Sequence, residues 1–278
     1  MGEAGATKRH PASDQAQIPI VWRYELLKYL RSKRLIASVA IAAVVVGLIY
    51  AIPYLTGDGY DNTTKEQFAV NFVQFASILV VICATFFGAD SIVGEFQNRT
   101  GYLVFPTPMK RETLFVGKFA ASMTAGIAVI TLFYIGVGVL SLGTVKGVDA
   151  DFFASYGYAL VYLLAVMAVA YFVSSILKGT TGATVLTFFL FIMILPIVDA
   201  VSMVGGAKIE ASLTFAGGVM TNILMDPYPV DVKTDFGQGM SFYTYYPDPA
   251  IAPFVMLAYA VAAMVLAMVL FKRKQLVG

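Results

Sequence analysis

The chain has 278 residues and a mass of 30.0 kDa, with 59% hydrophobic and 13% charged residues and a formal net charge of +2. Soluble domains carry about 25% charged residues, so this chain has too little polar surface to enclose one large soluble core. Disorder is excluded because it needs low hydrophobicity and high net charge. A disulfide scaffold is excluded because Cys83 is the single cysteine. These observations leave a polytopic membrane protein.

The N-terminal region divides into two parts. Residues 1–17 are polar and predict a flexible tail, in which the isolated His10 is a poor candidate for a metal ligand. Residues 18–33 predict an amphipathic helix along the inner membrane surface, with a simple extension of the first span as the alternative. Its apolar arc holds Trp22, Leu26, Tyr29 and Leu30. Its polar arc holds Glu25, Lys28, Arg31 and Ser32.

Six charge-free runs of 20 to 27 residues follow along the chain. A helix that crosses the membrane needs roughly 20 apolar residues, so each run is long enough for one crossing and too short for two. An open sheet could not satisfy its backbone in lipid, so residues 34–278 predict an all-α, six-helix transmembrane domain. The expected spans are residues 35–55, 68–89, 114–142, 152–176, 182–204 and 250–271.

The basic residues predict the orientation. With six crossings both termini share one side, and that side carries fifteen of the nineteen Lys and Arg residues. The other side carries Lys65, Lys146, Lys208 and Lys233. Basic residues concentrate in cytoplasmic segments, so we expect a cell-membrane protein with both termini in the cytoplasm. No basic stretch is interleaved with aromatic residues, so a nucleic-acid partner is not expected.

Residues 90–118, between the second and third spans, are rich in charge. We expect the second span to continue as a helix to about Arg99, with Gly101 able to end it. The next helix is expected to begin near Pro108, with Thr107 as its N-cap. The apolar tip at residues 102–105 is either a docking surface on the water side or a segment that folds back into the headgroup layer.

This segment has a recognisable order: an acidic residue, a Thr-Gly pair, an apolar stretch, a proline, a basic pair, and Gly-Lys at the start of a helix. The residues are Glu95, Thr100, Gly101, Leu103, Pro108, Lys110, Arg111, Gly117 and Lys118. In this pattern and in its layout of spans, the chain resembles the permease family of type 2 ATP-binding-cassette transporters. The family commonly has Gly before Thr, whereas Thr100 precedes Gly101 here, so the register of the coupling element can differ by a residue or two.

The resemblance implies that residues 95–108 form a coupling helix seated in a cleft of a separate ATPase subunit. The implied coupling residues are Glu95, Arg99, Thr100, Gly101, Tyr102 and Leu103. It also implies a second permease subunit, most simply a homodimer, and a minor second contact at the turn around Lys178. Neither Gly117-Lys118 nor the stretch 205–208 fits the phosphate-binding pattern GxxxxGK[ST]. We therefore expect this chain to bind no cofactor, with ATP and magnesium in the partner subunit.

The outer segment, residues 205–249, predicts further features. Residues 213–225 are apolar but too short to cross, so they predict a re-entrant or surface helix broken at Gly217-Gly218. Asp199, near the outer end of the fifth span, is either a pathway or gating residue or an interfacial cap. Tyr243, Tyr245 and Tyr246 belong either to an outer gate lid or to an aromatic belt at the headgroups.

The sequence thus predicts the permease subunit of an ATP-driven transporter, most simply an exporter, whose substrate path lies at a dimer interface. The substrate cannot be identified from the residues. Three alternatives remain: a membrane enzyme, a channel or secondary transporter, and a non-transporting anchor subunit. A membrane enzyme would need a polar catalytic constellation, and a channel or secondary transporter would need ionisable groups in the middle of a span. The sequence shows neither feature.

Overall fold

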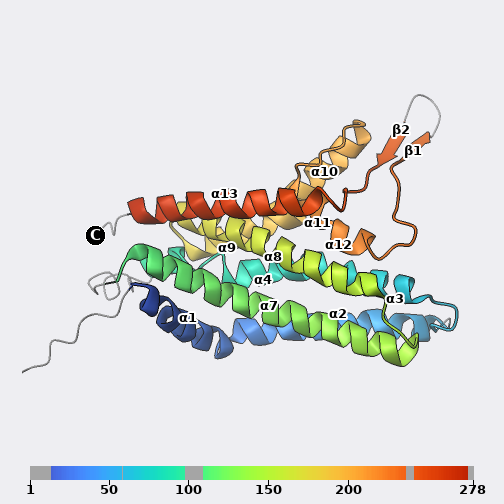
Figure 1. Ribbon diagram of the computed structural model, residues 1–278, viewed down its shortest axis with the longest axis horizontal. Coiled ribbons are helices and arrows are strands. Elements are labelled where there is room, and N and C mark those ends of the chain that lie inside the picture. The colour runs from blue at the N-terminus through green and yellow to red at the C-terminus, as the bar shows by residue number, and fades with distance from the viewer. Residues whose placement is uncertain (1–13, 58, 98–108, 236–240, 275–278) are drawn as a thin grey trace, which may run out of the picture.

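The computed structural model describes residues 14–57, 59–97, 109–235 and 241–274. Within these ranges the fold is a helical bundle with one short β-hairpin (Figure 1). The elements are α1 (Asp14–Leu30), α2 (Lys33–Thr56), α3 (Lys65–Val73), α4 (Ala76–Phe87), α5 (Val93–Gln97), α7 (Arg111–Thr144), α8 (Ala150–Ile176), α9 (Thr180–Phe189), η1 (Leu190–Ile194), α10 (Leu195–Val204), α11 (Leu213–Gly217), α12 (Val219–Asn222), β1 (Val232–Asp235), β2 (Ser241–Thr244) and α13 (Ala252–Arg273).

Six helical segments of the described chain are long and apolar enough to cross a membrane. They are Lys33–Thr56, Lys65–Phe87, Arg111–Thr144, Ala150–Ile176, Thr180–Val204 and Ala252–Arg273. The predicted all-α class and the six predicted spans are confirmed. Figure 1 places α1 and the C-terminal end of α13 at one end of the bundle, and the hairpin at the other.

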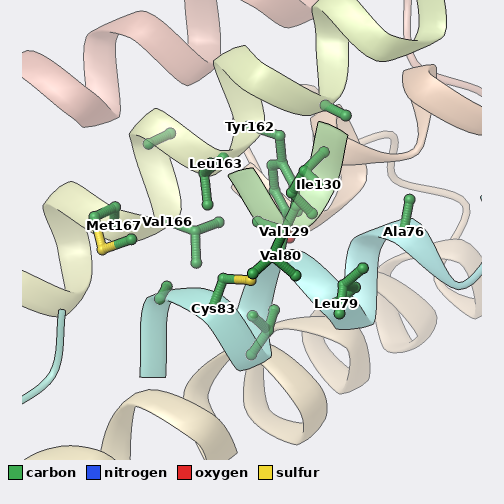
Figure 2. Packing of buried hydrophobic residues seen from close by; sticks show 14 of the residues in the cluster. Ala76, Leu79, Val80, Cys83, Val129, Ile130, Tyr162, Leu163, Val166 and Met167 are labelled. Carbon is green, nitrogen blue, oxygen red and sulfur yellow. The ribbon is translucent and has the colours of Figure 1, made fainter. Parts of the chain in front are cut away.

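The core lies where α8 packs against α4, α7 and α13. Figure 2 shows Leu79, Val80 and Cys83 of α4 in one buried cluster with Leu163 and Val166 of α8. On α13 the buried residues recur every three or four positions, which defines one helix face. They are Ala252, Met256, Ala260, Ala263, Ala267 and Phe271. The small side chains on this face allow α13 to approach α8 closely.

The first and fifth spans are far more exposed than the fourth. Only 11% of the most apolar window of each is buried inside the chain, against 67% for the span Ala150–Ile176. Their apolar side chains therefore face the surroundings of the single chain. In a membrane protein those surroundings are lipid or another subunit.

The predicted continuation of the second span to about Arg99 is wrong. Helix α4 ends at Phe87, a turn follows, and α5 begins at Val93. Packing explains the break: a Cβ added at Gly88 would lie 2.7 Å from the sulfur of Met167, so the chain passes α8 too closely for a regular helix with side chains there. The backbone N–H groups of Ile92 and Val93, at the start of α5, donate instead to Ser174 Oγ at 3.2 and 3.1 Å.

Several predicted boundaries also shift. Helix α1 begins at Asp14, four residues before the predicted start at residue 18. Helix α7 begins at Arg111 with Lys110 as its N-cap, so the prediction of Thr107 as N-cap is wrong. The predicted break at Gly217-Gly218 is confirmed, because α11 ends at Gly217 and α12 begins after Gly218. The antiparallel hairpin β1–β2 in the outer segment was not predicted.

Candidate functional site

A buried lysine joins three separate parts of the chain at the end of the bundle that holds α1. Lys118, in the second turn of α7, is only 1% exposed. Its Nζ lies 2.6 Å from Glu25 Oε1 on α1 and 2.6 Å from Glu95 Oε1 on α5. Lys28 Nζ approaches the other oxygen of Glu25 at 3.3 Å. We call Lys118, Glu25 and Glu95 the Lys118 triad.

Electrostatics explain why the two carboxylates surround Lys118. Removing a lone ammonium group from water costs several kcal/mol, so a buried lysine requires carboxylates around it. Two carboxylates would leave an excess negative charge, which Lys28 offsets at the edge of the cluster. The result is a compact ionic joint between the surface helix α1, the long helix α7 and the short helix α5.

A hydroxyl network extends this joint toward the bundle core. The carbonyl of Phe87 accepts hydrogen bonds from Tyr29 at 2.9 Å and Ser122 at 2.8 Å, and also from Ser91. Ser122 Oγ lies 2.7 Å from the hydroxyl of Tyr171 on α8. Phe87 is the last residue of α4, where carbonyls have no donor within the helix, so the hydroxyls supply what the helix end lacks. Burial raises the pKa of the Tyr29 phenol, which keeps its proton available for donation.

The segment from the end of α4 to α5 has further anchors. Asp90 forms an ion pair with Arg34 at the start of α2. Gln97 Oε1 accepts a hydrogen bond of 2.6 Å from the backbone N–H of Thr180, the first residue of α9. Lys274 Nζ lies 4.9 Å from the centre of the Phe96 ring and donates to Leu177 O at 2.7 Å. Residues 90–97 are therefore tied to five of the six spans or to their immediate ends.

Of the predicted coupling residues, Glu95 lies in the triad. Arg99, Thr100, Gly101, Tyr102 and Leu103 lie outside the described residues, so their role stays a prediction. Lys118 was not predicted as a structural centre, although a lysine near the start of a long apolar helix indicates that carboxylates lie close to it. It also placed Glu25 on the water-facing arc, whereas its side chain is only 15% exposed and faces Lys118.

A second polar site lies at the opposite end, in a cavity of about 490 Å³. Asp199, Tyr245 and Tyr246 line it, so the structure brings together three of the four predicted gate or pathway residues. The fourth, Tyr243, stacks on Tyr245 with ring centres 5.8 Å apart. Whether these residues gate a pathway stays a prediction.

Asp199 is held from one side only. Its Oδ2 accepts a hydrogen bond of 2.6 Å from Thr214 Oγ1, which comes from α11. Its Oδ1 is buried and has no hydrogen-bond partner among the described residues. Across the same residues, no group of three or more His, Cys, Asp or Glu side chains is placed to hold a metal ion.

Comparison with known proteins agrees with this architecture. The family model described as ABC-2 family transporter protein matches residues 19–276, which include all six candidate spans and both polar sites. A search of curated proteins gave no match. A family match over so much of the chain, together with six apolar helices in one bundle, places this multi-pass membrane protein in the ABC-2 family of transporter permeases.

Proposed function

We propose that this permease is the membrane subunit of an ATP-driven exporter that works as a dimer with two separate ATPase subunits. Membership of the ABC-2 family generally implies an ATPase partner. The sequence contains no phosphate-binding loop of the GxxxxGK[ST] type, which supports placing ATP and magnesium in that partner. The substrate path would lie between the two permease subunits.

The Lys118 triad carries this proposal. Glu95 begins residues 95–108, the segment that the family resemblance assigns to ATPase contact, and its carboxylate is 2.6 Å from Lys118 of α7. The same ammonium group contacts Glu25 of α1. A push on residues 98–108 would therefore reach α7 and α1 through charge-assisted hydrogen bonds, which are stronger than neutral ones.

The second contact, around Lys178, belongs to the same surface. The hydrogen bond between Gln97 and Thr180 brings the end of α5 beside the turn that precedes α9. One ATPase subunit could thus engage both turns at once. The excess of basic residues at this end supports a cytoplasmic location for it, and Figure 1 places α1 and the end of α13 there.

The exposed spans support a dimer. The spans Lys33–Thr56 and Thr180–Val204 bury little of their apolar surface within the chain. They leave apolar area for a second copy as well as for lipid. The aromatic residues around Asp199 lie at the opposite end from the ATPase contact, where an exporter would release its cargo.

The test is co-purification of the full chain with candidate ATPase subunits, followed by ATPase and transport assays. Replacing Gly101 with Arg and Tyr102 with Asp should release or uncouple the ATPase while membrane insertion is retained. Gly143→Arg is the matched control, because this position lies at the other end of α7 and an added Cβ meets nothing within 4 Å. Unchanged ATPase association and transport in the Gly101 and Tyr102 variants would refute the coupling assignment.

A further inference from the structure

The cavity around Asp199 holds a carboxylate oxygen that the coupling scheme does not use. Asp199 is 9% exposed, and its Oδ1 is buried without a partner among the described residues. A buried polar atom left without a hydrogen bond is destabilising, and more so when it is charged. Asp199 lines the cavity, so a positively charged ligand there would offset the charge of this carboxylate.

Among the described residues, no lysine or arginine lines the cavity. Lys208, the lysine nearest to Asp199 in sequence, lies 3.0 Å from Asp231 and 3.5 Å from Glu210. Although partial burial works against its charge, the hydrogen bond and charge of Asp231 raise the pKa of Lys208, so it remains committed to those carboxylates. Asp199 thus lines the cavity, and Thr214 is the one side-chain donor to its carboxylate among the described residues.

The rest of the cavity wall is mostly apolar and aromatic, with Ser77, Thr214 and Asn222 as its other polar side chains. The rings that line it are Tyr162, Phe191, Phe215, Tyr245 and Tyr246. Aromatic faces attract cations through the negative charge of their π-systems, and the attraction grows when water is excluded. One carboxylate among several rings is a suitable environment for a cation with an apolar body. An anion would be repelled by Asp199.

The fifth span is locally reshaped at this cavity. Helix α9 passes into the π-helical turn η1, where the N–H of Leu195 bonds to the carbonyl of Leu190, five residues earlier. Phe191 and Ile192 of this turn, and Pro196 just after it, line the cavity. Single π-helical turns inside α-helices occur often at functional sites. The extra residue in this turn changes which side chains of the span point toward the cavity, shortly before Asp199.

We propose that this cavity binds a lipophilic monovalent cation, an ammonium or phosphonium with aromatic or alkyl substituents. The Asp199 carboxylate is the counter-charge, and the aromatic rings hold the apolar body. The cavity, at about 490 Å³, is in the size range of small-molecule sites. The interpretation of such a cation as cargo depends on the proposed transport function, but its binding does not.

The test is saturation binding of radiolabelled tetraphenylphosphonium to the purified full chain in detergent, with no ATPase and no nucleotide present. Asp199→Asn should weaken binding about tenfold or more, because the cation loses the opposite charge in a site that is partly shielded from water; a tenfold loss corresponds to about 1.4 kcal/mol. Asp151→Asn is the matched control, since this exposed carboxylate lies at the start of α8 outside the cavity. The affinity of the Asp151→Asn variant for tetraphenylphosphonium should equal that of the wild type. Tetraphenylborate, which has the same shape and the opposite charge, should not bind saturably in a separate titration.

A second variant protects the test against misfolding. Ala200 lines the cavity, so Ala200→Trp should fill it and abolish binding while Asp199 is retained. The proposal is overturned if the wild-type chain shows no saturable binding of tetraphenylphosphonium, if Asp199→Asn binds as tightly as the wild type, or if tetraphenylborate binds equally well. These results are independent of ATPase coupling, so a failure here is distinguishable from a failure of the proposed function.

Discussion

Lys118 Nζ and Glu95 Oε1 lie 2.6 Å apart, although 23 residues separate them in the chain. The ion pair joins the long helix α7 to the short helix α5 that leads into residues 98–108. Glu25 completes the contact from α1 at the same distance of 2.6 Å. The three side chains therefore link the surface helix, the expected ATPase-contact segment and a transmembrane helix through one buried charge.

Lys118→Met should destabilise the protein strongly. Removing one partner of a buried ion pair leaves uncompensated charge and costs about 3–5 kcal/mol. We expect a clear fall in the thermal unfolding midpoint in detergent. The triple variant Lys118→Met, Glu25→Gln, Glu95→Gln should recover most of the loss, because it removes the two buried carboxylate charges that Lys118→Met leaves without the ammonium group. A triple variant less stable than Lys118→Met alone would show that charge pairing is not the source of the effect.

Glu95→Gln should lower the transport achieved per ATP hydrolysed while the ATPase subunit still co-purifies. The amide retains the shape of the carboxylate but weakens the bond to Lys118, so less of the motion of residues 98–108 reaches α7. Glu112→Gln is the matched control. Glu112 of α7 pairs with Lys272 of α13 at an exposed site, where ion pairs contribute about 0–1 kcal/mol. Equal coupling in the two variants would contradict a relay through the triad.

Two glycines of α7 should respond differently to replacement by alanine. A Cβ at Gly117 would lie 2.7 Å from the Cβ of Val21, so Gly117→Ala should push α1 away and cost about 1–3 kcal/mol. At Gly136 an added Cβ meets nothing within 4 Å, so Gly136→Ala should leave stability unchanged or raise it by about 0.5–1 kcal/mol. Thermal unfolding of the two variants measures the difference.

The same displacement can be followed optically, because Trp22 is the single tryptophan of the chain. Its Nε1 donates to Thr124 Oγ1 at 3.0 Å, which fixes α1 on α7. Gly117→Ala should therefore increase the quenching of Trp22 fluorescence by acrylamide. Unaltered quenching in a destabilised Gly117→Ala variant would place the steric strain elsewhere.

The sequence was sufficient for the six spans because the length of an apolar run is a property of the chain alone. It was not sufficient for the Lys118 triad, which exists only because α1 packs on α7 and α5 turns back beside them. The amphipathic pattern placed Glu25 correctly on the polar arc of its helix, but could not show that this arc faces a buried lysine. Likewise, Asp199 was visible as a carboxylate near a span end, whereas Thr214 joins it only through the fold of the outer segment.

The break after Phe87 was missed for a related reason. Residues 88–92 contain one glycine and no proline, so nothing local forbids a helix there. The close passage of Gly88 along Met167 and the hydrogen bonds to Ser174 are contacts with α8, a helix some 80 residues further along the chain. A prediction based on local signals therefore extended the helix to Arg99.

Cysteine labelling should establish the orientation with little background. The single native cysteine, Cys83, is fully buried in α4, so a membrane-impermeant maleimide should not label the folded chain. If the termini are cytoplasmic, Gly143→Cys, at the exposed outer end of α7, should be labelled on intact cells. Arg273→Cys, at the end of α13, should be labelled only after the membrane is permeabilised. The reverse pattern would invert the topology, and would place the Lys118 triad on the side of the membrane that has no ATP.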